Sequence, residues 1–255
     1  MWQNVRIVLV EPSHPGNIGA AARAMKTMGL SRLYLVAPRH PPGPETIALA
    51  SGADEVVRAA VTCAGLEEAI ADCHLVVGTT ARVRRHNEPG PDPRGCAREL
   101  VATARHQRVG LVFGREQAGL TNAELDRCHY RVHIPANPDY SSLNLAAAVQ
   151  IMAYEIRRAA ELEGAAPVPE VGPLAPAEML EGLFGHLEQA LIDIEFLYPD
   201  NPRHLMRRLR HLLNRARLTA DEVNILRGIL SAAQRKAGAK PLGGRGSRSD
   251  GPQGV

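Results

Sequence analysis

The chain has 255 residues, 45% of them hydrophobic, and a formal net charge of +3, a composition typical of a globular protein with one large or two modest domains. No apolar run approaches the roughly 18 residues that a membrane span requires, and the N-terminus lacks the apolar region of a signal peptide, so we expect a cytoplasmic protein with no membrane partner. Aromatic residues make up only 4% of the chain, which argues against nucleic-acid binding that depends mainly on base stacking.

The cysteines indicate a reduced protein without a metal site. Cys63, Cys73, Cys96 and Cys128 form no C-x-x-C pair and have no histidine at zinc-binding spacing. In a cytosolic protein such cysteines are expected to be free and mostly buried. We therefore expect four reduced thiols and no bound metal.

Short apolar runs with strand character alternate with helical patterns in the first part of the chain. Strands are expected at residues 5–10, 33–36, 75–77, 109–113 and 130–134, with helices between them, for example at 16–28 and 94–105. Strands that alternate with helices form βαβ units, so the pattern predicts an α/β domain with a largely parallel sheet. A long helix at 143–160 ends this domain, which we place at residues 1–160.

A stretch interrupted by glycine and proline separates this domain from a second, helical part. Residues 161–175 are expected to be a linker. Three helical segments follow at 176–198, 202–217 and 219–236, the last with Thr219 as its N-cap. They predict a small all-α C-terminal domain at 176–236. Residues 237–255 are rich in Gly, Ser, Arg and Pro, and we expect a disordered tail.

The net charge conceals an uneven distribution. Residues 1–160 carry 18 basic and 15 acidic side chains, residues 161–200 carry nine acidic ones and no Lys or Arg, and residues 201–248 carry 12 basic and two acidic ones. The arginines of segment 202–217 share a helical register with leucines and a methionine. A helix with one apolar stripe and one arginine face fits contact with phosphates. The alternative is a solvated face that balances the acidic helix before it.

Three separate segments place small or polar residues where an α/β core would be expected to have bulky ones. They are residues 15–23 (PGNIGAAAR), 113–120 (FGREQAGL), and 134–135 (IP) with 141–145 (SSLNL). The segments follow predicted strands, and open α/β sheets bind their ligands at strand ends. Each also has a purely structural alternative: turn glycines, Asn17 as a helix N-cap, Ser141 or Ser142 as the cap of the long helix, and Arg23 as a solvated surface arginine.

In this order the three segments resemble the three motifs of the SPOUT class of RNA 2′-O-ribose methyltransferases. The resemblance rests on Asn17 with Arg23, on Gly114-Arg115-Glu116, and on Ile134-Pro135 with Ser142-Leu143-Asn144. It is closer still to one tRNA-modifying branch of the class, through residues 22–30, 76–82, 119–122, 140–145, 185–189 and 224–230. Residues 85–90 depart from that branch because they lack its Trp-Pro pair, and Thr80 stands where Ser is common. The likeness covers about residues 1–236.

The resemblance implies a knot and a cofactor that the hydrophobic periodicity does not predict. SPOUT domains thread the chain near the third motif into a C-terminal trefoil knot, which forms the site for S-adenosylmethionine. The resemblance assigns this cofactor to Thr79, Thr80, Ala81, Gly114, Ile134, Ser141, Ser142 and Leu143. Small residues and backbone groups suit a bent, buried adenosyl group. No G-x-G-x-x-G follows a strand, which argues against a Rossmann-type site.

The same resemblance assigns catalysis to Arg23, Asn17, Glu116, Ser142 and Asn144. Arginine does not readily give up its proton. Arg23 is therefore expected to hold an RNA phosphate and to orient the ribose 2′-hydroxyl, whose proton leaves to that phosphate or to water. Asn17 and Asn144 would supply orienting hydrogen bonds, and Glu116 would fix either Arg23 or the loop.

The resemblance further implies a homodimer that methylates the ribose of a cytidine or uridine at position 32 of the tRNA anticodon loop, with no DNA partner. RNA contacts are assigned to Arg82, Arg84, Arg203, Arg207 and Arg210. One alternative is the same reaction at another tRNA position or on ribosomal RNA, which sequence does not separate because RNA targets are read by shape and loop contacts. The other is a catalytically silent RNA-binding protein, against which the complete set of catalytic residues argues.

Overall fold

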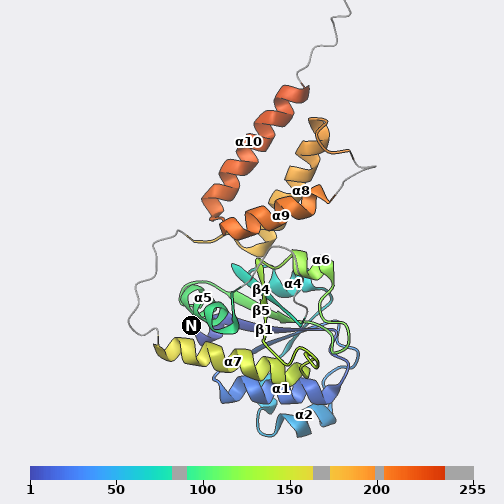
Figure 1. Ribbon diagram of the computed structural model, residues 1–255, viewed down its shortest axis with the longest axis vertical. Coiled ribbons are helices and arrows are strands. Elements are labelled where there is room, and N and C mark those ends of the chain that lie inside the picture. The colour runs from blue at the N-terminus through green and yellow to red at the C-terminus, as the bar shows by residue number, and fades with distance from the viewer. Residues whose placement is uncertain (82–90, 163–172, 199–203, 239–255) are drawn as a thin grey trace, which may run out of the picture.

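The computed structural model describes residues 1–81, 91–162, 173–198 and 204–238, and within them an α/β part is followed by three helices (Figure 1). Six parallel strands form one sheet in the order β3-β2-β1-β5-β4-β6. The strands are β1 (Val5–Val10), β2 (Arg32–Val36), β3 (Val61–Cys63), β4 (Leu75–Thr80), β5 (Val109–Phe113) and β6 (Tyr130–His133). A single 3-10 turn, η1 (Trp2–Asn4), precedes β1.

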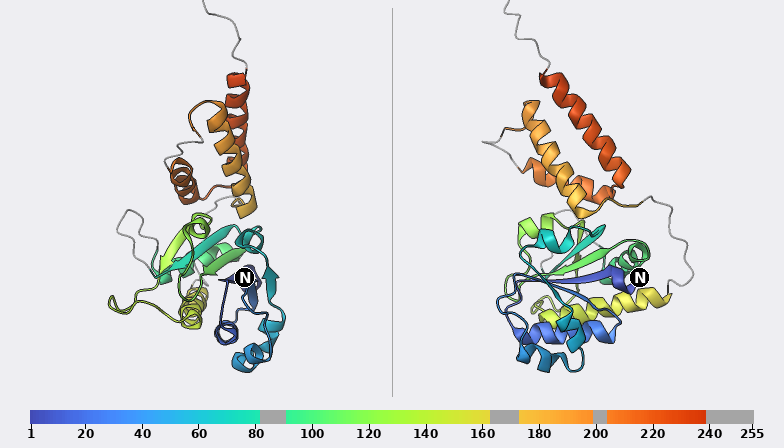
Figure 2. Two further views of the ribbon diagram at one scale, coloured as in Figure 1. Left: turned by 90° about the vertical axis from the view of Figure 1, so that its right-hand side faces the viewer. Right: turned by 180° about the vertical axis from the view of Figure 1, so that it is seen from behind.

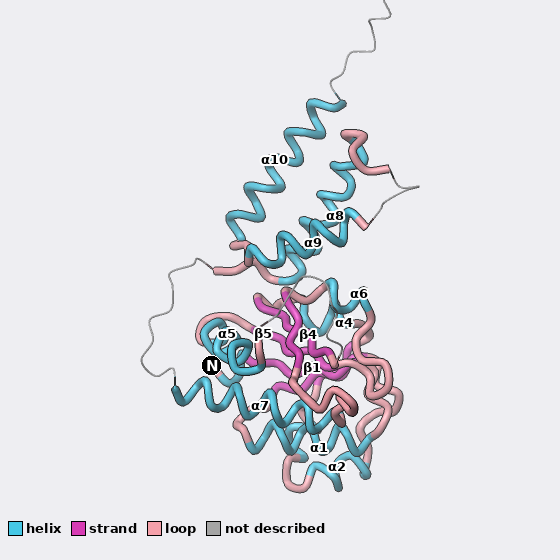
Figure 3. The backbone as a smooth tube through the Cα atoms, viewed as in Figure 1, coloured by secondary structure: helices cyan, strands magenta, loops and turns pink. Residues whose placement is uncertain are grey.

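The sheet is central because its strands are apolar on both faces. All six residues of β1 are buried, and Ile7 and Leu9 enter one hydrophobic cluster while Val8 and Val10 enter another. Strands that are covered on both faces read as continuous apolar runs. Figure 3 shows the strands between two groups of helices.

The helices divide between the two faces of the sheet. The first face is covered by α1 (Pro15–Thr27), α5 (Pro93–Ala104) and α7 (Leu145–Leu162), with α2 (Pro44–Ala50) and α3 (Asp54–Arg58) beside α1. The second face is covered by α4 (Leu66–Ile70) and by the start of the helical part, while α6 (Asn122–Asp126) joins β5 to β6.

One charged residue, Arg6, lies inside β1 and is only 4% exposed. Its guanidinium pairs with Asp72 at 2.8 Å, donates to the carbonyl oxygen of Ala69, and lies over the ring of Tyr34 at 4.0 Å from the ring centroid. A buried charge is tolerated only when it is paired and hydrogen-bonded. These contacts explain how an arginine occupies a strand whose other residues are apolar.

The helical part consists of α8 (Ala177–Asp193), α9 (Leu205–Ala216) and α10 (Ala220–Gly238), with a core that includes Leu183, Phe184 and Val223. In both views of Figure 2, α8 and α10 run side by side away from the α/β part. The backbone N–H groups of Ala177 and Glu178 donate to the carbonyl oxygens of Cys73 and Ala71 at 2.9 and 3.0 Å. The α/β part therefore satisfies donors that the first turn of α8 leaves unpaired.

The predicted α/β part followed by a helical part is confirmed, and the strands at 5–10 and 109–113 have their predicted bounds. Residues 61–63 and the helices α2, α3, α4 and α6 are not predicted, because elements of three to seven residues contain too little hydrophobic periodicity. β4 continues three residues beyond its predicted end, since the polar Thr79 and Thr80 still pair with β6.

The helix caps correct several predicted boundaries. α7 begins at Leu145 because the side-chain oxygen of Asn144, and not Ser141 or Ser142, accepts the N–H of Ala146 at 2.9 Å. Its end at Leu162 makes the first two residues of the predicted linker helical. α8 ends at Asp193, five residues early, and α10 reaches Gly238, two residues into the predicted tail. Residues 163–172 and 239–255 lie outside the described residues.

Two further predicted caps have opposite outcomes. α1 has His14 rather than Asn17 at its N-cap, which leaves the Asn17 side chain available for other contacts. Thr219 is the N-cap of α10 as predicted, because its hydroxyl oxygen accepts the N–H of Glu222 at 3.3 Å.

Among the described residues, all four cysteines are buried and free, and no group of three or more His, Cys, Asp or Glu side chains is placed to hold a metal ion. Of the helices in the described part of the chain, none combines the length and apolar character needed to cross a bilayer.

We expect Gly19 to be essential for the packing of α1 on α2. A Cβ at this position would lie 2.3 Å from the carbonyl oxygen of Thr46 and 2.9 Å from the backbone nitrogen of Ala50. Gly19→Ala should therefore lower the free energy of unfolding by about 1–3 kcal/mol, as overpacking does. Gly228→Ala in α10, where nothing lies within 4 Å, should instead be neutral or stabilise by about 0.5–1 kcal/mol. Urea denaturation measures both, and equal effects of the two changes would contradict the steric explanation.

Candidate active site

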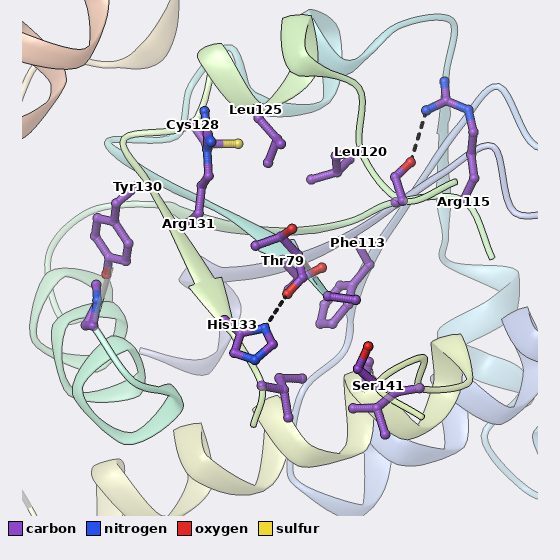
Figure 4. Close-up of a pocket in the computed structure, with 18 of the residues that line it drawn as sticks. Thr79, Phe113, Arg115, Leu120, Leu125, Cys128, Tyr130, Arg131, His133 and Ser141 are labelled. Carbon is purple, nitrogen blue, oxygen red and sulfur yellow. Dashed lines mark hydrogen bonds between the residues drawn. The ribbon is translucent and has the colours of Figure 1, made fainter. Parts of the chain in front are cut away.

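A cavity of about 1060 Å³ lies at the carboxyl ends of β4, β5 and β6 (Figure 4). Its walls come from the end of β4, from the loop between β5 and α6, from the segment between β6 and α7, and from α9. Ligand pockets usually enclose roughly 300–1000 Å³, so this cavity is large enough for a nucleoside-sized molecule with space beyond it. Its position agrees with the expectation that open parallel sheets bind ligands at strand ends.

All eight residues that the sequence assigns to the cofactor line this one cavity. They are Thr79, Thr80, Ala81, Gly114, Ile134, Ser141, Ser142 and Leu143. They come from three segments, of which the first and the last are more than 50 residues apart along the chain. The parallel sheet brings these segments together.

Gly114 permits a close approach of two backbone segments in the cavity wall. A Cβ at this position would lie 2.1 Å from the carbonyl carbon of Gly119 and 2.3 Å from the backbone nitrogen of Leu120. Gly119 itself has a φ of +69°, which glycine adopts readily. The loop from Gly114 to Leu120 is therefore folded back tightly on itself, and a side chain at Gly114 would displace backbone rather than another side chain.

The polar candidates Asn17, Glu116 and Asn144 form one hydrogen-bonded chain. Glu116 accepts from the side-chain amide of Asn17 at 3.2 Å, and Asn17 accepts from the side-chain amide of Asn144 at 2.9 Å. Asn144 in turn caps α7. Three side chains from three predicted motifs thus connect the start of α1, the loop after β5 and the start of α7.

Glu116 also holds the loop that precedes α1. Its carboxylate accepts from the backbone N–H groups of Ser13 and His14 and from the Ser13 hydroxyl, at 3.0–3.3 Å. Partial burial opposes ionisation of this carboxyl, but hydrogen bonds from the backbone and from Asn17 outweigh it and lower the pKa of Glu116. Glu116 was expected to fix either Arg23 or the loop, and its hydrogen bonds support the second role.

Arg23 lies apart from this chain of contacts. It is exposed on α1, six residues after Asn17 or about 9 Å along the helix axis, and it is not among the residues that line the cavity. Ser142 lines the cavity, whereas Asn17 and Asn144 lie beside it, Asn17 through its hydrogen bond to Glu116 and Asn144 through its hydrogen bond to Asn17.

Several residues of the cavity could not be predicted from the sequence. Phe113, Leu120 and Leu125 form apolar walls, and they look like ordinary core residues in the sequence. His133 lies on the wall with its Nδ1 3.1 Å from the carbonyl oxygen of Thr80 (Figure 4). A single histidine in a strand gives no sequence signal, so its position became apparent only in the fold.

The helical part contributes a wall that the sequence did not indicate. Three residues of α9 line the cavity, together with the residue that follows the helix. They are His211, Asn214 and Arg215, followed by Arg217. Contacts hold α9 there: the Asn214 amide donates to the carbonyl oxygen of Cys128 at 3.2 Å, and Asp126 pairs with both Arg207 and His211.

The candidate RNA-binding arginines differ in their surroundings. Arg207 lies 3.0 Å from Asp126, and Arg210 pairs with both oxygens of Glu181 while it lies over the ring of Phe184. Both arginines therefore have acidic partners within the protein. Arg82, Arg84 and Arg203 lie outside the described residues. Arg208 and Arg215 of the same helix are exposed.

The family model of the SpoU rRNA methylase family matches residues 4–154, and the model of the C-terminal domain of the tRNA methyltransferase TrmJ matches residues 178–241. The chain belongs to the SpoU rRNA methylase family. Its resemblance to RNA methyltransferases, predicted from the three motifs, is confirmed, and the first match contains every residue assigned to the cofactor and to catalysis.

Relatives of the family support the same grouping over both parts of the chain. The tRNA (cytidine/uridine-2'-O-)-methyltransferase TrmJ of Cronobacter sakazakii is 51% identical over 245 residues, which cover 94% of this chain and 100% of that protein. The crystal structure of TrmJ from Z. mobilis ZM4 is similar with a TM-score of 0.75 and 38% identity, covering 89% of this chain and 97% of that one. An AdoMet-bound rRNA methyltransferase from Sinorhizobium meliloti is similar with a TM-score of 0.50 and 28% identity, covering 62% and 57% of the two chains.

Glu116→Gln should destabilise the SpoU-type domain in a pH-dependent way. At pH 7 the amide presents only one oxygen to the N–H donors of Ser13 and His14, so the free energy of unfolding should fall by about 1–3 kcal/mol. The pKa of Glu116 is lowered in the folded state. The carboxylate therefore contributes fully to the free energy of unfolding above the unfolded-state pKa of about 4.3, and this contribution is lost as the pH falls below that value.

The measurement is urea denaturation of both proteins between pH 3 and pH 7. The difference between wild type and Glu116→Gln should shrink only below about pH 4.3. Glu68→Gln, which alters a similar carboxylate cap of the Ala64 N–H outside the site, provides the control. A Glu116 difference that is independent of pH would show that the ionised carboxylate is not the stabilising form.

Proposed function

We propose that this protein is an S-adenosylmethionine-dependent methyltransferase that 2′-O-methylates the ribose of a cytidine or uridine at position 32 of the tRNA anticodon loop. The main support is the cavity that gathers all eight expected cofactor residues. The names of its relatives, which include a tRNA (cytidine/uridine-2'-O-)-methyltransferase at 51% identity, support the tRNA substrate. A cytoplasmic location follows from that substrate. Position 32 is an expectation from the motif resemblance.

The residues present fit an adenosyl group. A Cβ at Gly114 would clash with the backbone of Gly119 and Leu120, so glycine lets the loop 114–120 fold tightly on itself in the cavity wall. Main-chain groups of this loop can then face a flat ligand. Phe113, Leu120 and Ile134 provide apolar walls, and Ser141 and Ser142 provide hydroxyls. S-adenosylmethionine would supply an electrophilic methyl group, and the protein would supply position and orientation.

The protein's own part in the reaction is to present a ribose hydroxyl to that methyl group. No residue of the hydrogen-bonded chain Glu116–Asn17–Asn144 is a ready base: Glu116 is ionised but has its oxygens occupied by donors, and the two amides do not titrate. This supports a role in holding α1 and α7 in a fixed relation. Arg23, exposed on the same α1, would hold an RNA phosphate and orient the 2′-hydroxyl.

Arg23→Lys and Arg23→Ala should both lose most methyl transfer while they retain cofactor affinity. Lysine keeps the charge but lacks the planar fork that binds a phosphate through two hydrogen bonds. Methyl transfer to tRNA measures the loss, and calorimetric titration with S-adenosylmethionine measures retention. Arg58→Lys, an exposed arginine on α3, is the control. Near-normal turnover of Arg23→Lys would make Arg23 a surface arginine without this role.

Mass spectrometry of tRNA from cells with and without this protein tests the target itself. Loss of 2′-O-methylcytidine and 2′-O-methyluridine at position 32 is the expected result. Loss at another tRNA position or in ribosomal RNA would change the target but not the reaction. Unchanged RNA, together with RNA binding by the purified protein, would favour a catalytically silent RNA-binding protein.

We place the RNA-binding surface on the helical domain, with residues 1–160 as the catalytic domain, 161–175 as the linker and 176–236 as the helical domain. The basic excess of residues 201–248 supports this assignment. Arg207 would have to break its ion pair with Asp126, and Arg210 its ion pair with Glu181, before either could bind a phosphate. The exposed Arg208 and Arg215 need no such exchange and are the stronger candidates.

Replacing both Arg208 and Arg215 by alanine should weaken tRNA binding and make it less dependent on salt. Each lost phosphate contact removes about 0.7–0.9 from the slope of log affinity against log salt concentration. A salt series of tRNA binding measures this slope, with Arg58→Ala as the control. Equal slopes for the double variant and the wild type would make this arginine face a solvated surface only.

We also propose that the protein is a homodimer. The large side chains of Tyr154 and Leu162 on α7 are 44% and 71% exposed, and a second copy of the chain that packed against α7 would cover them. Light scattering should give twice the chain mass of 27.5 kDa. A mass equal to one chain would contradict the proposal.

The trefoil knot of the SPOUT class belongs to the same proposal. β6 follows β5 in the sequence but pairs with β4, and the chain then crosses to α7 on the face that holds α1. This arrangement is compatible with threading near the third motif. A crystal structure that traces the chain from β4 to α7 without interruption would test it, and a trace without a crossing would contradict it.

A further inference from the structure

Arg115 has an unusually complete set of partners for a loop arginine. Its Nη1 and Nη2 donate to the two carboxylate oxygens of Glu124 at 3.0 Å each, and Nη2 also donates to Glu11. Nη1 lies 3.4 Å from the carbonyl oxygen of Gly119 (Figure 4). A planar guanidinium is the side chain that can serve acceptors on several sides at once.

The partners of Arg115 lie in three separate segments of the chain. Glu11 directly follows β1 and has a φ of +45°, with its backbone N–H bonded to the carbonyl oxygen of Val36. Glu124 lies in α6, where its carboxylate also accepts the N–H of Thr121 at 2.7 Å. Gly119 exchanges two backbone hydrogen bonds with Arg115, at 2.9 and 3.2 Å. One side chain thus joins the end of β1, the first turn of α6 and the Arg115–Gly119 turn that lies between β5 and α6.

The loop that these contacts hold is a wall of the cofactor cavity. Every residue from Gly114 to Leu120 lines the cavity, and none of them belongs to a helix or strand. Their positions therefore depend on side-chain contacts and on the short Arg115–Gly119 turn. Glu116, which follows Arg115 directly, contacts the loop before α1.

We propose that Arg115 is a positioning residue for the cofactor, which fixes the loop 114–120 in the shape that the adenosyl group requires. This inference rests on the proposed function of the cavity. Arg115 acts through the loop and needs no contact with the reacting atoms. The hydrogen bonds that Arg115 donates to Glu11 and Glu124 raise the pKa of Arg115, so its charge is permanent and the loop should hold its shape across the physiological pH range.

The test measures cofactor affinity separately from methyl transfer. Arg115→Gln removes the charge and most of the fork, and Arg115→Lys keeps the charge with a single point of attachment. Glu11→Gln removes one acidic partner and leaves the pair with Glu124 intact. Arg127→Lys is the matched control, because Arg127 is also a partly buried arginine of the α6 region that pairs with an acid, Glu67, but does not line the cavity.

Calorimetric titration with S-adenosylmethionine and with S-adenosylhomocysteine should show affinity reduced on the order of tenfold to a hundredfold in Arg115→Gln, because small displacements of positioning groups have effects of that size. Arg115→Lys should not restore it, and Glu11→Gln should show a smaller loss. KM for the cofactor should rise most in the two Arg115 variants and less in Glu11→Gln. The affinity of each variant for tRNA at fixed salt should stay within about twofold of the wild-type affinity.

Thermal denaturation of the same variants separates positioning from general stability. If Arg115→Lys and the control Arg127→Lys lower the midpoint equally and both retain cofactor affinity, Arg115 is a structural residue and the inference is wrong. If wild type binds S-adenosylmethionine but methylates no RNA, the proposed function fails while the affinities of the variants still decide the role of Arg115. If wild type does not bind the cofactor, the proposed function and this inference fall together.

Discussion

The site depends on one constraint: loops without regular structure must keep fixed positions at the edge of the sheet. The strands themselves are held by buried apolar side chains, but the segments after β1, β5 and β6 have few such contacts. Two groups of charge-assisted hydrogen bonds hold these segments, one centred on the carboxylate of Glu116 and one on the guanidinium of Arg115 with its two glutamates. Charge-assisted hydrogen bonds are stronger than neutral ones, which suits loops that must hold a ligand without the support of a helix or strand.

The two residues at the centres of these groups are adjacent in the chain, but one accepts hydrogen bonds and the other donates them. Glu116 is an acceptor for the loop before α1 and, through Asn17 and Asn144, for the start of α7. Arg115 is a donor to the end of β1 and to α6. Two neighbouring residues therefore fix the loop from both sides. The cost is that each carboxylate needs its donors, since an unpaired charge in a partly buried position is unfavourable.

The segments that the sequence singles out lie together in the structure, whereas several short elements around them could not be predicted from the sequence. Gly114, directly after β5, is visible as a departure from a hydrophobic pattern. The eight cofactor residues, which the family resemblance assigned, all line one cavity. Short elements such as β3 lack enough periods to be recognised. The wall formed by α9 was not predictable, because His211 and Asn214 look like residues on a solvated amphipathic helix until the fold places that helix against Asp126 and Cys128.

The packing of α9 alters how its charge relates to RNA. Arg207 is paired with Asp126 and Arg217 with Glu99, both in the SpoU-type domain, so part of the basic excess that the sequence suggested for RNA already has partners. Salt screens these exposed or partly exposed pairs as well as contacts with phosphate. If α9 binds RNA as proposed, rising salt would weaken its contacts with phosphate and would also loosen the ion pairs that occupy Arg207. The two effects oppose one another, so the salt slope would be smaller than the number of arginines that touch phosphate implies, and it would report mainly the exposed arginines of α9.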